Sequence, residues 1–329
     1  MRVVVCEAFG PVGDLKVVER DPAPCGESAV RIAVTAIGVN YVDGLFVKGE
    51  YQIKPPLPFT PGMELVGRIV EAGPAVTDRQ EGDRVFVNVG LGAYASEVVV
   101  PAARTMLLPA DDSVLSDGQA ATFLQSYMTG WFALRERLAV REGQVLLVLG
   151  AGGGVGAAAV DIGALLGLRV IAVASTAEKR DLAMRQGASA VIDSSTEDVK
   201  ERAKEIAGEW GASGVDVIYD PVGGEQSAVC LRALGDDGAL LVIGFVAGIP
   251  MLPANQVLLR NRRVIGVDWG GWALRNGTRN DELTAEVLDH VLAGRLHPVE
   301  PVSYPLDRAA DALADLDGRR IAGKVALRP

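Results

Sequence analysis

The sequence predicts an α/β protein of two domains, in which a doubly wound parallel sheet is inserted in a β-rich domain. Its 329 residues exceed the roughly 100–200 residues of one ordinary domain. Short β-type runs separated by Gly and Pro fill residues 1–122, and continuous apolar runs alternate with helical segments over 123–270. Residues 271–329 read as a return to the first domain. We therefore expect a β-rich domain from 1–122 plus 271–329 around a central domain at 123–270.

The β-rich part is recognised by alternation of apolar and polar residues. "AVRIAVTAIGV" (29–39) and "LVGRIVEAG" (65–73) alternate, and "DRVFV" and "ASEVVVP" follow. Between the first two runs, "KPPLPFTPG" (54–62) contains four prolines. A residue before proline is pushed out of the helical region, so this segment is predicted to be extended loop.

The central part alternates apolar strands with helices, which is typical of a parallel sheet buried on both faces. Six strands connected by crossovers describe the Rossmann nucleotide-binding fold. The predicted strands are 145–150, 169–175, 190–193, 215–220, 239–244 and 264–269, and the helices between them include 155–167, 177–187 and 197–208. A further helix, at 281–294, is followed by a strand-like "VEPVSYPL" (299–306), another helix and "GKVALRP".

Composition excludes several classes of function. With 32 basic and 42 acidic residues the net charge is −10, so a nucleic-acid partner or an anionic membrane surface is not expected. The three cysteines, Cys6, Cys25 and Cys230, lack the paired spacing of a zinc site or a disulfide framework. The N-terminal "MRVVVCEAFG" has no signal-peptide architecture, and the apolar stretch 145–160 is too short and too rich in glycine to span a bilayer. A cytoplasmic protein is expected.

The glycine cluster "AGGGVG" follows the first strand of the central part and opens its first helix, the context of a dinucleotide fingerprint. Ala151 stands at the first glycine position, and Gly153 and Gly156 occupy the second and third. Gly153 would let the backbone approach a pyrophosphate, while Gly154 and a helix beginning near Val155 would offer it free N–H groups. The alternative is a merely flexible turn. An ATP site is not supported, because no Gly-Lys-Ser/Thr follows.

The end of the second strand indicates which dinucleotide is bound. In "VASTAEKRD", Ser175 and Thr176 stand where an Asp or Glu would accept hydrogen bonds from a ribose 2′-OH. Lys179 lies one helical turn further on and would attract a 2′-phosphate, which favours NADP(H). The alternative is that Lys179 and Arg180 are solvated helix residues.

These features together resemble the zinc-independent quinone oxidoreductase branch of the medium-chain dehydrogenase/reductase superfamily, and the resemblance covers essentially the whole chain. It implies a GroES-like catalytic domain built from both chain ends, a central Rossmann domain, and a homodimer paired along the apolar sixth strand "VIGVDW". The motifs that carry it are "GVNYVD" (38–43), "LPFTPGMELVGRIVEAG" (57–73), "GDRVF" (82–86), "AGGGVG" (151–156), "STAEK" (175–179), "VDVIYDPVGG" (215–224) and "AGKVAL" (322–327).

The resemblance also implies that no metal takes part. In the zinc-dependent alcohol dehydrogenase relatives, a Cys stands where this chain has Asn40 and a His where it has Met63. An amide and a thioether are poor Zn²⁺ ligands, and "VNVGLGAYASEVVV" (87–100) lacks the cysteines of a structural zinc lobe. Without a Lewis acid to activate an alkoxide, reduction of an already electrophilic acceptor remains.

Two residues are candidates for the chemistry. Asn40, in the place of the lost ligand, could hydrogen-bond a nicotinamide ribose or a substrate carbonyl. Tyr51 matches a tyrosine that related enoyl reductases place near the substrate as a proton donor, and a tyrosine is protonated at neutral pH. The alternative for Tyr51 is an aromatic residue packed beside Pro55 and Pro56. Asp43 is expected to tie its loop to a backbone amide.

The remaining cofactor contacts are implied by the family alone. Leu45 and Ser194 depart from it, since both replace tyrosines of characterised quinone reductases, and the loss at Leu45 weakens the case for a quinone as the acceptor. His290 and His297 are expected on the surface. The implied contacts are Thr129, Gly244, Phe245, Val246, Val267, Trp269 and Lys324.

The function predicted is NADPH-dependent hydride transfer to a small electrophilic acceptor, a quinone or the β-carbon of an enone, enal or enoyl thioester. Two alternatives stay open. One is a dinucleotide-binding redox sensor or structural protein with little catalysis, and the other is a pathway-specific enoyl reductase of secondary metabolism.

Overall fold

The computed structural model describes residues 1–329, which divide into two compact units. The first unit joins Met1–Phe123 to Pro298–Pro329, and the second is Leu124–His297. Both chain ends therefore lie in one unit, and the central residues form the other. No helix of the chain is both long and apolar enough to cross a membrane.

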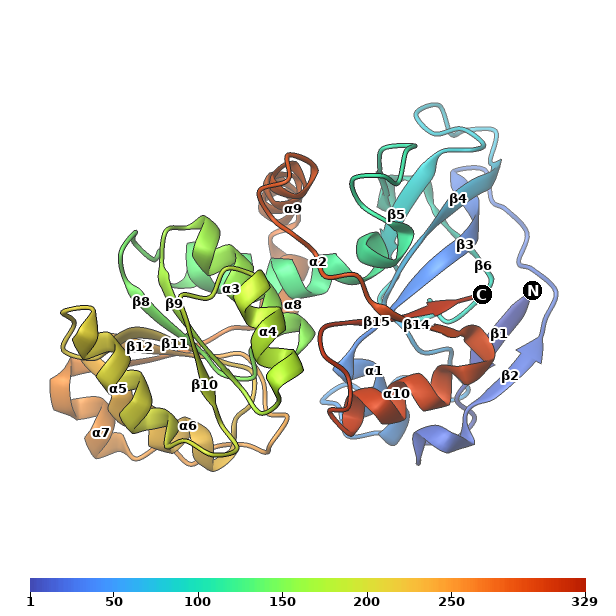
Figure 1. Ribbon diagram of the computed structural model, residues 1–329. Coiled ribbons are helices and arrows are strands. Elements are labelled where there is room, and N and C mark those ends of the chain that lie inside the picture. Colours follow the sequence, from blue (N-terminus) through green and yellow to red (C-terminus); the bar gives the residue numbers. More distant parts are fainter. The chain divides into compact units, whose positions relative to one another are not determined.

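The first unit is built on a seven-stranded sheet of order β14-β15-β3-β4-β5-β7, with β6 also paired to β3, and on a β1-β2 hairpin (Figure 1). All pairs are antiparallel except β14-β15, which is parallel. The predicted loop 54–62 contains neither helix nor strand. The strands are β1 (Arg2–Val5), β2 (Lys16–Glu19), β3 (Ala29–Val39), β4 (Glu64–Ala72), β5 (Arg84–Asn88), β6 (Glu97–Pro101), β7 (Thr105–Leu107), β14 (Val302–Pro305) and β15 (Val325–Arg328), and the helices are α1 (Tyr41–Lys48) and α10 (Ala309–Asp317).

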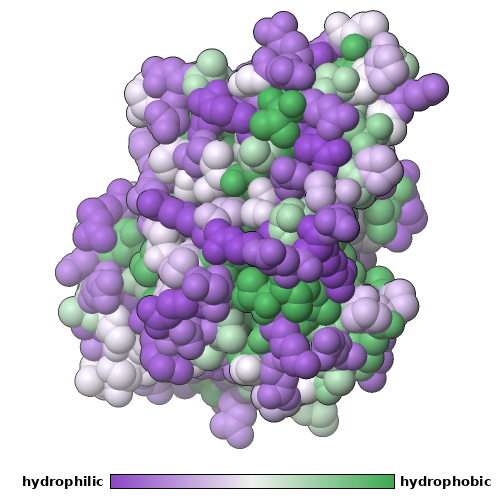
Figure 2. Space-filling model, turned by 90° about the vertical axis from the view of Figure 1, so that its right-hand side faces the viewer, coloured by the Kyte–Doolittle hydropathy of each residue, from purple (hydrophilic) through white to green (hydrophobic).

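The core of the first unit follows from the alternation seen in the sequence. Every second residue of β3 from Val30 to Val34 is buried, and Leu313 of α10 joins these side chains in one apolar cluster. On the face shown in Figure 2, hydrophilic residues predominate and surround smaller hydrophobic patches.

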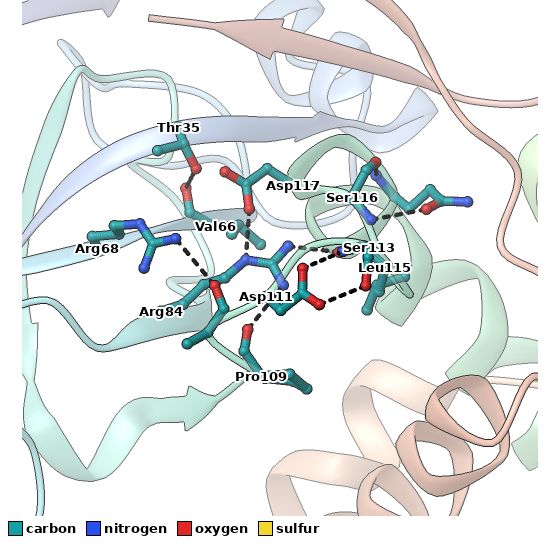
Figure 3. Close-up of polar contacts among 12 residues, drawn as sticks. Thr35, Val66, Arg68, Arg84, Pro109, Asp111, Ser113, Leu115, Ser116 and Asp117 are labelled. Atoms are coloured by element: carbon teal, nitrogen blue, oxygen red, sulfur yellow. Dashed lines mark hydrogen bonds and ion pairs between the residues drawn. The ribbon is translucent and has the colours of Figure 1, made fainter.

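A buried arginine holds the loop that leads into α2 (Asp117–Trp131). The Arg84 guanidinium, in β5, donates hydrogen bonds to Asp117 Oδ1 at 2.7 Å, to the Leu115 carbonyl at 2.8 Å and to the Pro109 carbonyl at 3.2 Å (Figure 3). Its side chain is 1% exposed. Because a buried cation is stable only when its donors are used, these contacts fix where α2 begins.

The second unit is built on a six-stranded sheet of order β10-β9-β8-β11-β12-β13, in which every pair is parallel. In chain order this is the 3-2-1-4-5-6 arrangement of the Rossmann fold, so the fold prediction is confirmed. The strands are β8 (Val145–Val148), β9 (Arg169–Ala174), β10 (Ala190–Asp193), β11 (Val215–Asp220), β12 (Leu234–Val242) and β13 (Arg263–Gly266).

Helices cover both faces of this sheet (Figure 1). On one face Leu147 packs in a cluster with Ala203 and Ile206 of α5. On the other face α3 lies so close that a Cβ on Gly163 would be 2.9 Å from Leu146 and Val170. Strands buried on both sides need apolar residues at every position, which explains their continuous apolar runs. The helices are α3 (Gly154–Leu165), α4 (Ala177–Arg185), α5 (Val199–Glu209), α6 (Gly224–Cys230), α7 (Ala254–Leu258), α8 (Trp269–Arg275) and α9 (Gly277–Leu292), and a π-helical turn, Phe132–Arg137, follows α2.

The compact units differ from the expected domains at one boundary. The sequence grouped residues 271–297 with the first domain, whereas α8 and α9 lie in the second unit. The apolar side of α9 packs on α2, where Thr284 Oγ1 contacts Met128 Sδ at 3.7 Å and the Trp131 indole donates to Glu286 at 3.3 Å. The end of the sixth strand therefore does not mark the end of the unit, because a helix must bury its apolar side against whichever surface is available.

Candidate active site and cofactor site

The glycine turn connects β8 to α3 in a conformation that needs glycine at particular positions. Gly150 has φ +61°, in the left-handed region. A Cβ on Gly156 would lie 2.3 Å from the Gly150 carbonyl oxygen, so the helix can pack on the turn only without a side chain there. Gly153, the exposed N-cap of α3, has space, since a Cβ there would be 3.6 Å from its nearest neighbour. The turn thus presents the N-terminus of α3, with Gly153, Gly154 and Val155, to an anion.

The end of β9 lies against this turn. Ser175 is exposed, and Thr176 is the N-cap of α4, accepting a hydrogen bond from the Lys179 backbone N–H at 3.3 Å. The aliphatic stem of Lys179 covers Gly152, because a Cβ at residue 152 would lie 2.4 Å from Lys179 Cβ and 2.5 Å from its Cγ. Lys179 and the glycine turn, which were predicted as cofactor-binding groups from two different motifs, are therefore adjacent in the structure.

The neighbouring cation, Arg180, has a different role. Its guanidinium forms an ion pair with Asp193 at the end of β10, with a distance of 2.9 Å. It also donates to the Ala174 carbonyl at 3.4 Å. Arg180 thereby links the ends of β9 and β10.

The other candidates in the second unit follow strands of the same sheet. The turn containing Gly244, Phe245 and Val246 follows β12, and Val267 and Trp269 follow β13. Because the strands are parallel, these turns and the glycine turn all lie at the carboxyl edge of the sheet, where open α/β sheets bind ligands. Thr129 lies within α2 and its hydroxyl donates to the Gln125 carbonyl at 2.7 Å.

Asp220, which the sequence analysis did not single out, stabilises the turn after β11 at this edge of the sheet. Asp220, at the end of β11, accepts hydrogen bonds from the backbone N–H groups of Val222 and Gly223, both at 2.9 Å, and from the Ser227 hydroxyl. Asp220 is 2% exposed. The motif "YDPVGG" could have indicated it, because an Asp two residues before a turn commonly accepts from the turn's amides.

In the first unit, Asn40 belongs to a buried polar network. Its Oδ1 accepts from Lys324 Nζ at 2.7 Å, and its Nδ2 donates to Glu64 Oε1 at 2.9 Å. Lys324 Nζ lies 3.9 Å from the same Glu64 oxygen. Asn40, Glu64 and Lys324 are 7%, 0% and 8% exposed. Sequence reasoning did not single out Glu64. The predicted contact of Lys324 with the cofactor stays a prediction, and in this structure its ammonium is bonded to Asn40.

Asp43 extends this network below Asn40. Its Oδ2 accepts from the Asn40 backbone N–H at 2.9 Å and from the Tyr94 hydroxyl at 3.1 Å, and its Oδ1 has no partner. The expectation that Asp43 ties its loop to a backbone amide is confirmed. Complete burial raises the pKa of Asp43 to about 7, although both hydrogen bonds oppose the shift. The pKa of Lys324 is lowered by burial, against the attraction of Glu64 and Asp43.

The first-unit residues do not fit a zinc ion. No group of three or more His, Cys, Asp or Glu side chains is placed to hold a metal. The Asn40 oxygen, which stands where a cysteine ligand would be needed, is already bonded to an ammonium. A cation beside it would be repelled by Lys324 at close range. The donor set is thus that of a buried ion pair with an amide, and Met63 adds only a thioether.

Tyr51 lies in the loop after α1 and is half-buried. Its ring packs on Phe46 with centroids 4.6 Å apart and an interplanar angle of 52°. Of the two prolines expected to pack beside Tyr51, Pro55 is buried and Pro56 is exposed.

The two predicted surface histidines differ. His297 has a side chain 64% exposed, but its Nδ1 lies 3.1 Å from Asp161 Oδ1 and its backbone N–H donates to Asp161 Oδ2 at 2.6 Å. The same carboxylate accepts from the Tyr127 hydroxyl at 2.6 Å. His290 packs on Trp131 with centroids 5.3 Å apart, and burial lowers its pKa. Both therefore serve packing and anchoring.

Comparison with known proteins assigns the family. The model "Alcohol dehydrogenase GroES-like domain" matches residues 26–110, and the model "Zinc-binding dehydrogenase" matches 154–286. A quinone oxidoreductase-like protein 2 homolog of Nematostella vectensis is 36% identical over 306 residues, which are 92% of this chain and 82% of that protein. The chain belongs to the quinone oxidoreductase branch of the medium-chain dehydrogenase/reductase superfamily.

Solved structures agree with this family. The quinone oxidoreductase of Escherichia coli, complexed with NADPH, superposes with a TM-score of 0.88 at 29% identity, with both chains fully covered. The quinone oxidoreductase of Thermus thermophilus, also known in complex with NADPH, gives a TM-score of 0.84 at 32% identity over the whole of both chains. The GroES-like plus Rossmann fold and an oxidoreductase family are thus shown.

Proposed function

We propose that this protein is an NADPH-dependent, zinc-independent reductase that delivers a hydride to an electrophilic acceptor, a quinone or the β-carbon of an α,β-unsaturated carbonyl compound. The observation that carries the proposal is the contact between Lys179 and Gly152, which puts a cation beside the glycine turn. At the nearby end of β9, Ser175 and Thr176 stand where a carboxylate would otherwise be expected. The NADPH complexes of the Escherichia coli and Thermus thermophilus relatives support it.

The second unit supplies the groups that would hold the dinucleotide. The free N–H groups of Gly154 and Val155 at the start of α3 suit a pyrophosphate, and Lys179 with Ser175 suits an adenosine 2′-phosphate. The remaining candidate contacts are Thr129 in α2 and, in turns at the carboxyl edge of the same sheet, Gly244, Phe245, Val246, Val267 and Trp269. When bound, NADPH supplies the hydride.

The first unit supplies the polar groups proposed to act on the acceptor. Asn40 retains one Nδ2–H beyond its bond to Glu64, and this N–H can donate to an oxygen atom of a ribose or to a carbonyl oxygen. Tyr51 is the proposed proton donor to the developing enolate.

The deciding experiment follows NADPH oxidation by absorbance against quinones, enals, enones and enoyl thioesters. Turnover of at least one class is expected, with Tyr51→Phe lowering kcat by about 10²–10⁴-fold for an enone if the tyrosine is the acid. No turnover with any acceptor would refute the proposal. NADPH binding without turnover would instead indicate a redox sensor or structural protein.

Cofactor preference has a matched test in two adjacent cations. Lys179→Met is expected to weaken NADPH binding at least tenfold while leaving NADH binding unchanged, because only the former carries the 2′-phosphate. Arg180→Met is the control, since Arg180 is paired with Asp193. An equal effect of both variants on the NADPH/NADH ratio would contradict the assignment of Lys179.

A homodimer is proposed on the edge strand β13. This strand pairs only with β12, and exposed apolar side chains surround it: Val264 is 41% exposed, Leu259 55% and Leu258 79%. An unpaired apolar strand edge is a template for pairing with another chain, here a second copy. Light scattering after size exclusion should give twice the 34.5 kDa chain mass, and Val264→Lys should give monomer.

A further inference from the structure

The network around Asn40 lies at the ends of three adjacent strands. In the first unit β3 lies between β15 and β4, with Val39 opposite Val325 and Gly38 opposite Glu64. Asn40 directly follows β3, and Lys324 directly precedes β15. The register therefore places these three side chains beside one another, although Asn40 and Lys324 are 284 residues apart in the chain.

The two charges give the Asn40 carboxamide one favourable orientation. Its oxygen faces the Lys324 ammonium at 2.7 Å, and its nitrogen faces the Glu64 carboxylate at 2.9 Å. Rotating the amide by half a turn would point the oxygen at the carboxylate and the nitrogen at the ammonium. Both contacts would then be repulsive in a buried site, where hydrogen bonds to charged groups are strongest.

Gly38 leaves the space that the Glu64 side chain occupies. A Cβ on Gly38 would lie 2.7 Å from Glu64 Cγ and Oε1 and 2.2 Å from the Ala121 carbonyl oxygen, so only glycine admits the carboxylate at this place. Burying an ammonium and a carboxylate costs several kcal/mol per ion before their attraction offsets it, so apolar residues would serve stability as well. The pair is therefore better explained by what it does to Asn40.

We propose that Lys324 and Glu64 are positioning residues, which hold the Asn40 carboxamide with its second N–H as a fixed donor to an oxygen atom of the acceptor or of the nicotinamide ribose. This inference rests on the proposed function, because it assigns Asn40 to the reaction. In this role Lys324 acts through its hydrogen bond to Asn40.

The main variant removes both charges together. Lys324→Met alone would leave the buried Glu64 carboxylate without the Lys324 ammonium beside it and could unfold the unit. The double variant Lys324→Met, Glu64→Gln is neutral and keeps an acceptor for Asn40 Nδ2. The matched control, Lys48→Met with Asp317→Asn, removes a lysine–carboxylate pair of 2.9 Å in the same unit that does not touch Asn40.

The first readout is the NMR signal of the Asn40 side-chain amide in protein labelled with ¹⁵N-asparagine, identified by its loss in Asn40→Ala. In the neutral double variant its proton exchange should be at least tenfold faster and its position should shift. In the control pair it should not change. An unchanged signal in the neutral double variant overturns the proposal, whether or not the protein turns over any acceptor.

The second readout is steady-state turnover with the acceptor found in the panel. The neutral double variant should lose about 10- to 100-fold in kcat/KM, and adding Asn40→Ala should cost little more, because all three substitutions remove one function. Lys324→Arg should recover part of the loss. Additive losses, or a neutral double variant as active as the wild type, overturn the proposal. A wild type without turnover refutes the proposed function alone, while the NMR signal still decides the positioning.

Discussion

The glycine turn offers a sharp test, because two of its glycines are needed for different reasons. At Gly156 a methyl group would meet three backbone atoms, at 2.3, 2.8 and 2.9 Å in Gly150 and Ala151, where ordinary contact is 3.4 Å or more. Backbone cannot rotate away as a side chain can. Overpacking typically costs about 1–3 kcal/mol, and the roughly 1 kcal/mol gained from alanine's helix propensity offsets part of it. Because the atoms met are backbone, the cost lies at the upper end, about 3 kcal/mol, and we expect Gly156→Ala to lower the free energy of unfolding by about 2 kcal/mol after the offset.

Gly153→Ala should behave differently. The nearest atom to its Cβ would be 3.6 Å away, so the only folding cost is a poorer N-cap, about 0.5–1 kcal/mol. The new methyl group would, however, occupy the surface proposed for the pyrophosphate, so NADPH binding should weaken at least tenfold. Gly208→Ala is the control: it lies in α5, has no atom within 4 Å of its Cβ, and should gain up to about 1 kcal/mol.

The assay can follow the second unit alone. All four tryptophans, Trp131, Trp210, Trp269 and Trp272, lie within Leu124–His297, so tryptophan fluorescence during urea unfolding reports that unit. Isothermal titration gives NADPH affinity for the same samples. A Gly156→Ala protein as stable as Gly208→Ala would refute the packing argument. A Gly153→Ala protein that binds NADPH as the wild type does would refute the phosphate assignment.

Three further substitutions test the buried polar groups. Arg84→Met should cost about 3–5 kcal/mol in unfolding followed by circular dichroism, because two carbonyls and Asp117 lose their donor, and a cost below about 1 kcal/mol would show that water replaces it. Asp161→Ala should cost about 1–3 kcal/mol in tryptophan-detected unfolding, since the Tyr127 hydroxyl and the His297 backbone N–H would both lose the oxygen that accepts from them, and an unchanged midpoint would contradict this. For Asp43, the folded pKa of about 7 lies above the unfolded value near 3.8, so its contribution to stability is complete below about pH 4 and is lost as the pH rises to about 7. Urea unfolding at several pH values should show this decline in the wild type, and Asp43→Asn should remove it; parallel curves for the two proteins would show that Asp43 does not titrate in this range.

Element types were predictable because they depend on local patterning. Continuous apolar runs such as "VLLV" at 145–148 became parallel strands, and the alternating run 29–39 became β3. The glycine fingerprint was likewise local, since a strand, a turn and a helix follow one another within residues 145–165. Asp43 could be placed at a backbone amide because the N-terminus of its own helix supplies that amide.

The boundary between the two units and the hydrogen-bond partners of Asn40 were not predictable from local patterning. The polar and apolar sides of α9 showed that it packs, but not that α2 covers it, so residues 271–297 were grouped with the first domain although they lie in the second unit. Lys324 was recognised only as a residue near the cofactor, because nothing near it in the chain indicates its bond to Asn40. The bond between Glu64 and Asn40 could not be predicted for the same reason.

The sequence by itself determined the Rossmann and β-rich parts, the glycine turn, the poor zinc-ligand types of Asn40 and Met63, and the cation at Lys179. These follow from residue type and from spacing along a few turns or strands. Only the tertiary structure decided that Lys179 covers Gly152, that Lys324 and Glu64 are hydrogen-bonded to Asn40, and that Asp161 is hydrogen-bonded to His297. Strand register and helix packing bring these groups together, and both are set by burial of the whole core and not by neighbours in the chain.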